Sequence, residues 1–101
     1  MDFKVSRTID ATHPSLPGHF PGSPIVPGVV ILDEIVAALT ARRPNITVNS
    51  IPVVKFVAPL KPDQSFMIQF SNVDGGEIDF RCQVENQVIV DGRLRVGCKT
   101  S

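Results

Sequence analysis

Prolines and glycines recur throughout residues 14–28, and they constrain this chain more than any other feature of the sequence. Proline lacks a backbone N–H and fixes its own φ, so this spacing excludes a regular helix and disrupts any strand ladder. The segment is nevertheless partly apolar, with Leu16, Phe20, Ile25 and Val26. We therefore expect an ordered loop that packs against the core, and ordered loops often carry function.

Residues 29–43 contain neither proline nor glycine, and their apolar side chains point in nearly every direction around a helix. Pro27 and Gly28 suit the start of a helix, while Arg42 and Arg43 suit its negative end before Pro44. We predict a helix here that is buried on almost all sides. Such a helix needs more cover than a flat sheet gives, which favours a curved sheet wrapped around it.

Alternating apolar and polar residues predict strands before and after this helix. The expected strands are residues 3–9, 53–58, 65–71, 77–85 and 87–99. Residues 74–76 and 85–87 are short enough to join antiparallel hairpins, and Asp91-Gly92 is interpreted as a bulge or a further turn. The sequence thus predicts an α+β fold with one helix and an antiparallel sheet.

The chain has 101 residues, so we expect a single domain over residues 1–101. Hydrophobic residues make up 43% and charged residues 20%, which is typical of a globular protein. Cys82 and Cys98 lie in alternating apolar patterns, which favours buried free thiols over a disulfide or a metal site.

Ten basic and ten acidic residues cancel without forming a long block of either sign. This balance disfavours nucleic acid and anionic membranes as partners. The N-terminal residues lack the apolar stretch of a secretory signal, and no apolar run approaches the length of a membrane span, so we expect a cytoplasmic protein. A local basic patch is still open to the chain, from Arg42, Arg43, Lys55, Lys61, Arg81, Arg93 and Arg95, and it would suit an acidic carrier protein.

The segment from Gly18 to Val29 reads Gly-His-Phe-Pro-Gly-Ser-Pro-Ile-Val-Pro-Gly-Val. It resembles the signature of the beta-hydroxyacyl-[acyl-carrier-protein] dehydratase family, and residues 55–64 are more weakly similar to that family's strand and turn. The resemblance implies a hotdog fold and removal of water from a 3-hydroxyacyl group held as a thioester on acyl carrier protein. It implies no organic cofactor and no metal.

Elimination of water from such a thioester needs a base, an acid and a group that stabilises charge on the carbonyl oxygen. By resemblance, the catalytic residues are His19 and Asp33, and the substrate-binding residues are Gly28, Phe20 and Pro27. Histidine titrates near neutral pH, and a backbone N–H of Gly28 at a helix start would be open to close approach. We expect Asp33 among apolar helix residues, where burial raises the pKa of a carboxyl, and Glu34 in a purely structural role.

In the family, the histidine and the carboxylate of one site come from two subunits, and the acyl chain runs along their interface. The resemblance therefore implies a homodimer, with a heterodimer as the alternative. The sequence departs from the family in several places. Ala37 stands where many members have glutamine, which concerns the finer mechanism. Lys61-Pro62-Asp63-Gln64 lacks the family's glycine, and the loop before Gly18 lacks an aromatic pair common there, which concerns the shape of the substrate pocket. Aspartate at the acidic position resembles the branch that also isomerises the double bond, but one residue does not establish that activity.

Other readings of the chain stay open at this point. A hotdog thioesterase is one, because the fold hosts both activities. A catalytically weak partner subunit that binds acyl carrier protein is another. A metal site built from His13, His19 and an acid is disfavoured, because His13 lacks the usual ligand spacing.

Overall fold

The structure is a computed structural model that describes residues 2–10, 25–73 and 75–98. The predicted loop residues 14–24 lie outside this part of the chain. The elements are β1 (Asp2–Thr8), α1 (Gly28–Arg42), β2 (Ile46–Phe56), β3 (Ser65–Val73), β4 (Glu77–Val84) and β5 (Gln87–Cys98). The predicted α+β layout is confirmed.

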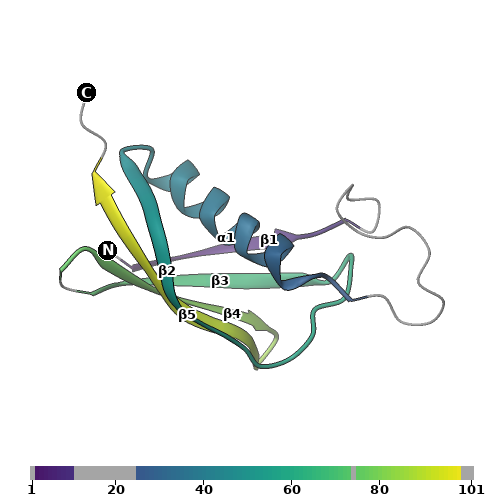
Figure 1. Ribbon diagram of the computed structural model, residues 1–101. Coiled ribbons are helices and arrows are strands. Elements are labelled where there is room, and N and C mark those ends of the chain that lie inside the picture. Colours follow the sequence, from purple (N-terminus) through teal and green to yellow (C-terminus); the bar gives the residue numbers. More distant parts are fainter. Residues whose placement is uncertain (1, 11–24, 74, 99–101) are drawn as a thin grey trace.

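The five strands form one sheet in the order β1-β3-β4-β5-β2, and every neighbouring pair is antiparallel. Strands β1 and β2 are therefore the two edges of the sheet as described. Figure 1 shows the sheet strongly twisted, with α1 lying across one of its faces. The twist follows from the right-handed preference of each strand and lets a small sheet curve around a single helix.

Alternation along the strands separates an apolar inner face, toward α1, from a polar outer face. On β4, the buried Ile78, Phe80 and Cys82 alternate with Glu77, Asp79 and Arg81. The inner face meets buried residues of α1, chiefly Ile31, Ile35 and Leu39. Three phenylalanines on the central strands, with at most 2% of their surface exposed, are the largest buried side chains of this core: Phe66, Phe70 and Phe80.

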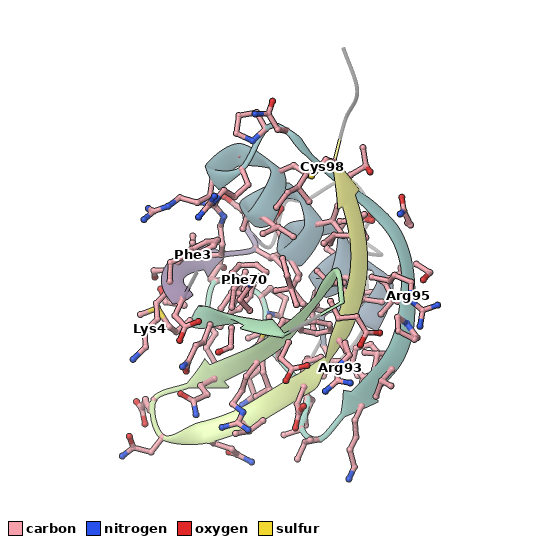
Figure 2. The ribbon with its side chains drawn as sticks, turned by 90° about the vertical axis from the view of Figure 1, so that its left-hand side faces the viewer. Phe3, Lys4, Phe70, Arg93, Arg95 and Cys98 are labelled. Atoms are coloured by element: carbon pink, nitrogen blue, oxygen red, sulfur yellow. The ribbon has the colours of Figure 1, made fainter. Side chains whose placement is uncertain are left out.

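A second contact ties the far end of α1 to strand β1. Phe3 stacks on Phe70 with ring centroids 4.8 Å apart, and the two rings lie side by side in Figure 2. The guanidinium of Arg42, in the last turn of α1, lies 4.9 Å from the centroid of the Phe3 ring. A cation over an aromatic face is attracted by the ring quadrupole, so this contact holds the C-terminal end of the helix over the edge of the sheet.

The prediction that α1 is buried on almost all sides is wrong for the single chain. Its buried residues form one face, whereas Val29 is 65% exposed and Asp33 and Ala37 are also exposed. These three residues are spaced by four and therefore share one stripe of the helix. The sheet covers only the opposite side, so the apolar character of this stripe has no partner within the described chain.

Strand β2 begins at Ile46, well before the predicted start at Val53. Its first part pairs with β5 through register shifts between Val48 and Ser50 and between Ser50 and Val53. Irregular pairing of this kind removes the simple alternation on which the prediction rests. The tertiary pairing with β5 therefore extends the strand beyond its local pattern.

Asp91-Gly92 is neither a turn nor a bulge, because both residues pair regularly within β5. The register shift in the β4–β5 pair falls instead between Cys82 and Gln83. A side chain at position 92 would collide with the carbonyl oxygen of Val53 and with the Phe80 ring. The glycine is required by this close approach of neighbouring strands.

Ion pairs cross the outer face between β4 and β5. Arg93 donates a hydrogen bond to Asp79 over 2.7 Å, and Arg95 donates one to Glu77 over 3.3 Å. The hydrogen bond and then the charge of Asp79 raise the pKa of Arg93 further above its usual value. Figure 2 shows Arg93 and Arg95 projecting from β5. Both arginines are thus engaged within the sheet and add little to a basic patch for a partner.

The two cysteines differ in their surroundings. Both are free, but Cys82 is buried while Cys98 is exposed, so the prediction that both are buried is wrong for Cys98. Desolvation raises the pKa of the Cys82 thiol to about 12. Among the described residues, no helix is both long and apolar enough to cross a membrane.

The two faces of β3 allow a matched test of the core. Ile68 is fully buried, whereas its neighbour Met67 is 39% exposed on the outer face. We expect Ile68→Ala to lower the free energy of unfolding by about 2–5 kcal/mol, because it leaves a cavity. Met67→Ala should change it by less than about 1 kcal/mol. Urea unfolding measures both, and equal losses would contradict this assignment of faces.

Thiol reactivity should separate the two cysteines. A thiolate is the reactive species, and the raised pKa and burial of Cys82 leave almost none of it at mildly alkaline pH. We expect Ellman's reagent to modify one thiol quickly in the folded protein and both after denaturation. Cys98→Ser should abolish the fast reaction. Fast modification of two thiols in the folded protein would show that Cys82 is accessible.

Candidate active site

The structure places three of the five predicted site residues near the beginning of α1. Pro27 precedes the helix, Gly28 is its first residue, and Asp33 follows in its second turn. His19 and Phe20 lie outside the described residues, so their roles stay predictions. The structure therefore describes the part of the predicted site that lies on and just before α1.

The start of α1 is not capped by any side chain of the described residues, and its first turn contains no acidic residue. The carbonyl of Pro27 accepts hydrogen bonds from Val30 N over 3.0 Å and from Ile31 N over 3.4 Å. The N–H groups of Gly28 and Val29 have no acceptor in the described ranges. Two donors at the positive end of the helix thus suit a developing negative charge on an oxygen.

Asp33 lies on the exposed stripe of α1 with Val29 and Ala37. Its neighbours along the helix are apolar, as expected. The side chain is nevertheless exposed, so the single chain does not bury it as expected. No hydrogen bond or ion pair joins Asp33 to another described residue. Its carboxylate is therefore available to a group from outside the described part of the chain.

Glu34, the adjacent carboxylate, is occupied. Its Oε1 lies 3.8 Å from Nε of Arg7 on β1, and both side chains are about one third exposed. A partly exposed pair of this kind contributes little to stability, but it directs Glu34 toward the sheet. The geometry therefore distinguishes the two carboxylates: Glu34 faces β1, whereas Asp33 faces away from it.

Sequence reasoning missed Phe56, which contacts the start of the helix. A side chain at Gly28 would place its Cβ only 2.6 Å from Cζ of Phe56. The ring thus fills the space beside the glycine and is itself 49% exposed. The strand prediction included Phe56, but no local pattern connects it with Gly28, and only the folded arrangement brings them together.

A hollow of about 400 Å³ lies on the outer face of the sheet, away from the predicted site residues. Its lining mixes opposite charges, including Arg81 with Asp91 and the hydrogen-bonded pair of Arg93 with Asp79. None of the predicted site residues that the structure describes, which are Pro27, Gly28 and Asp33, contributes to it. The hollow is therefore separate from the part of the predicted site that the structure describes.

A metal site was the remaining alternative. Among the described residues, no three histidine, cysteine, aspartate or glutamate side chains lie close enough to hold a metal ion. The two histidines on which that alternative rests, His13 and His19, lie outside the described ranges.

The sequence model of the ApeI-like family, described as ApeI dehydratase, matches residues 2–93. The chain belongs to this dehydratase family. A curated relative is the 3-hydroxyacyl-[acyl-carrier-protein] dehydratase FabZ of Chlamydia trachomatis serovar L2, which is 30% identical over 104 residues. That alignment covers 89% of this chain and 68% of the relative. The family relationship predicted from the sequence is confirmed.

Similar solved structures confirm the hotdog fold. The dehydratase heterocomplex ApeI:P from Xenorhabdus doucetiae matches with a TM-score of 0.76 and 24% identity, covering 97% of this chain and 88% of that one. An (R)-hydratase from A. caviae involved in PHA biosynthesis matches with a TM-score of 0.78 and 14% identity, covering 97% and 94%. The antiparallel sheet with one helix across its face is thus a hotdog fold.

Proposed function

We propose that this chain removes water from a 3-hydroxyacyl group carried as a thioester on acyl carrier protein, giving a trans-2-enoyl thioester. The observation that carries the proposal is the match of residues 2–93 to the dehydratase family. The helix α1 agrees with it, because its first N–H groups have no acceptor in the described ranges and Asp33 follows in its second turn. The FabZ relative supports acyl carrier protein as the carrier of the substrate.

In the proposed mechanism, His19 removes the proton from C2 of the acyl chain. Asp33 donates a proton to the C3 hydroxyl, directly or through a water molecule, and the C3–O bond breaks to release water. The N–H of Gly28 donates a hydrogen bond to the thioester carbonyl, which stabilises the enolate-like charge. Proton transfer from His19 back to Asp33, through solvent, restores the starting state. Phe20 and Pro27 line the substrate beside these groups.

The exposed stripe of α1 supports a site completed by a second subunit. Val29 and Asp33 are exposed on α1, and the apolar residues Ile25, Phe56 and Val57 are exposed as well. Phe56 lies against Gly28, the residue before Val29. Strand β2, which carries Phe56, is an edge of the sheet. A partner over this surface would enclose Asp33 and exclude bulk water from it.

We propose a homodimer as this partner arrangement, with a heterodimer as the alternative. Val29 and Phe56 are exposed apolar residues, and Phe56 lies on β2, an edge strand of the sheet. Both features suit a second copy with the same surface. The Xenorhabdus relative is a heterocomplex, which makes a different dehydratase-like chain the alternative partner. A cytoplasmic location stays a prediction.

The activity is tested by hydration of a trans-2-enoyl group on acyl carrier protein, the reverse reaction, followed by loss of enoyl absorbance and by product mass. We expect activity in the wild type and a loss of about 10²-fold or more in His19→Ala and Asp33→Asn, because each removes a proton-transfer group. Glu34→Gln is the matched control, since Glu34 pairs with Arg7, and it should keep most of the activity.

Two results of this assay would overturn the proposal. Release of a free thiol would indicate thioester hydrolysis and a thioesterase, because dehydration leaves the thioester intact. A folded wild type without activity at every acyl-chain length would indicate a partner subunit, which a second dehydratase-like chain should then complete.

The dimer is tested by light scattering after size exclusion. We expect the wild type to have about twice the chain mass of 11.0 kDa. Val29→Glu should give a monomer with lost activity, because a charge would enter the apolar interface. Glutamate is favourable in the first turn of a helix, so α1 should persist. The control Met67→Glu, on the outer face, should stay dimeric; a wild type that is active as a monomer would refute the shared site.

A further inference from the structure

The segment from Phe56 to Leu60 connects the sheet to the beginning of α1, and we call it the strap. Its first residues are fixed to β5, since the N–H groups of Val57 and Ala58 donate to the carbonyl of Ile89 over 2.8 and 3.2 Å. Its last residue, Leu60, is fully buried and accepts a hydrogen bond from Val26 N over 2.8 Å. The strap therefore transmits the position of β5 to the residues that precede the helix.

Phe56 supplies the side-chain contact from the strap to the first residue of α1. Its Cζ and Cε1 lie 2.6 and 2.8 Å from the position that a Cβ on Gly28 would take. Carbon atoms in ordinary contact lie farther apart than this, so the ring lies directly against the glycine Cα. Movement of the ring would therefore move the first backbone N–H groups of the helix or leave a gap beside them.

Core packing alone does not explain an aromatic residue at this place. Phe56 remains 49% exposed, whereas the three core phenylalanines of the central strands are at most 2% exposed. Its ring lies against Gly28, whose N–H has no acceptor in the described ranges. A hydrogen bond to a developing oxyanion is strengthened where an apolar surface keeps water away and the donor is held rigidly.

We propose that Phe56 is a positioning residue for the dehydration. It fixes the Gly28 N–H against the thioester carbonyl and shields that hydrogen bond from water on one side. This inference rests on the proposed function and adds to it a residue that does not touch the reacting atoms. It also explains why Gly28 must be glycine, because any side chain there would displace the ring or the helix.

Replacement of Phe56 by leucine tests the proposal. We expect Phe56→Leu to lower kcat about tenfold to a hundredfold, because a donor displaced by a fraction of an ångström stabilises the transition state poorly. KM should change less than about threefold, and the pH profile of kcat should keep its shape, since no titrating group is altered. The mass of the assembly and its Tm are measured beside the kinetics.

Val54→Ala is the matched control, because Val54 is an exposed apolar residue on the same strand and the same inner face, two residues earlier. Loss of apolar surface at this edge would affect both variants equally. Loss of the contact with Gly28 would affect only Phe56→Leu. Equal kcat values for the two variants, or a lowered Tm with unchanged kcat, would refute the positioning role.

A double-mutant cycle gives a second test of the contact. Gly28→Ala should lower kcat, because the new methyl group overlaps the Phe56 ring, and Phe56→Leu should relieve part of this overlap. The loss in the double variant should therefore be smaller than the product of the two single losses. Simple multiplication of the losses would refute the proposal. A wild type inactive on every acyl carrier protein thioester would instead refute the proposed function, and this inference with it.

Discussion

The contact between one face of α1 and the phenylalanine-rich inner face of the sheet governs the rest of this structure. Ile35 and Leu39 are fully buried against Phe66, Phe70 and Phe80. Because one small sheet covers only one side of a helix, the same contact forces the opposite stripe outward. Asp33 lies on that stripe. The packing that stabilises the fold thus also presents the predicted acid to whatever covers the helix.

Much of this fold could be predicted from the sequence, because its signals are local. The alternation of Ile78, Phe80 and Cys82 indicates β4 directly, and proline and glycine delimit the helix. The beginning of β2 could not be predicted, since its irregular pairing with β5 breaks the alternation. Burial of α1 was overestimated for a different reason. A helix that is apolar all round needs cover on all sides, but the sequence does not say which part of the cover comes from the same chain.

Sequence patterns could indicate only those candidate site residues that lie close together along the chain. Gly28 and Asp33 lie on one helix, so a motif and a fixed spacing can identify both. Phe56 is brought to Gly28 by the strap, whose hydrogen bonds to Ile89 and Val26 join three separate parts of the sequence. The periodicity of apolar residues does not indicate a contact of this kind. Two signals were available. Residues 55–64, which include Phe56, weakly resemble the family, and a glycine at a helix start often marks a close approach by another group.

The two faces of the sheet differ in character: the outer face carries charged pairs, and the inner face is apolar. On the outer face, Arg93 and Arg95 pair with acidic residues directly opposite on β4, so opposite charges favour the observed register although each exposed pair stabilises it little. These pairs also neutralise charge that a partner could otherwise recognise.

On the inner side, apolar surface remains exposed where α1 begins and β2 ends. A hotdog scaffold does not by itself choose between dehydration and hydrolysis. The choice depends on the groups that a chain adds to the scaffold. Dehydration needs N–H donors that stabilise an enolate and an acid that protonates the leaving hydroxyl, whereas hydrolysis needs an activated water at the carbonyl carbon.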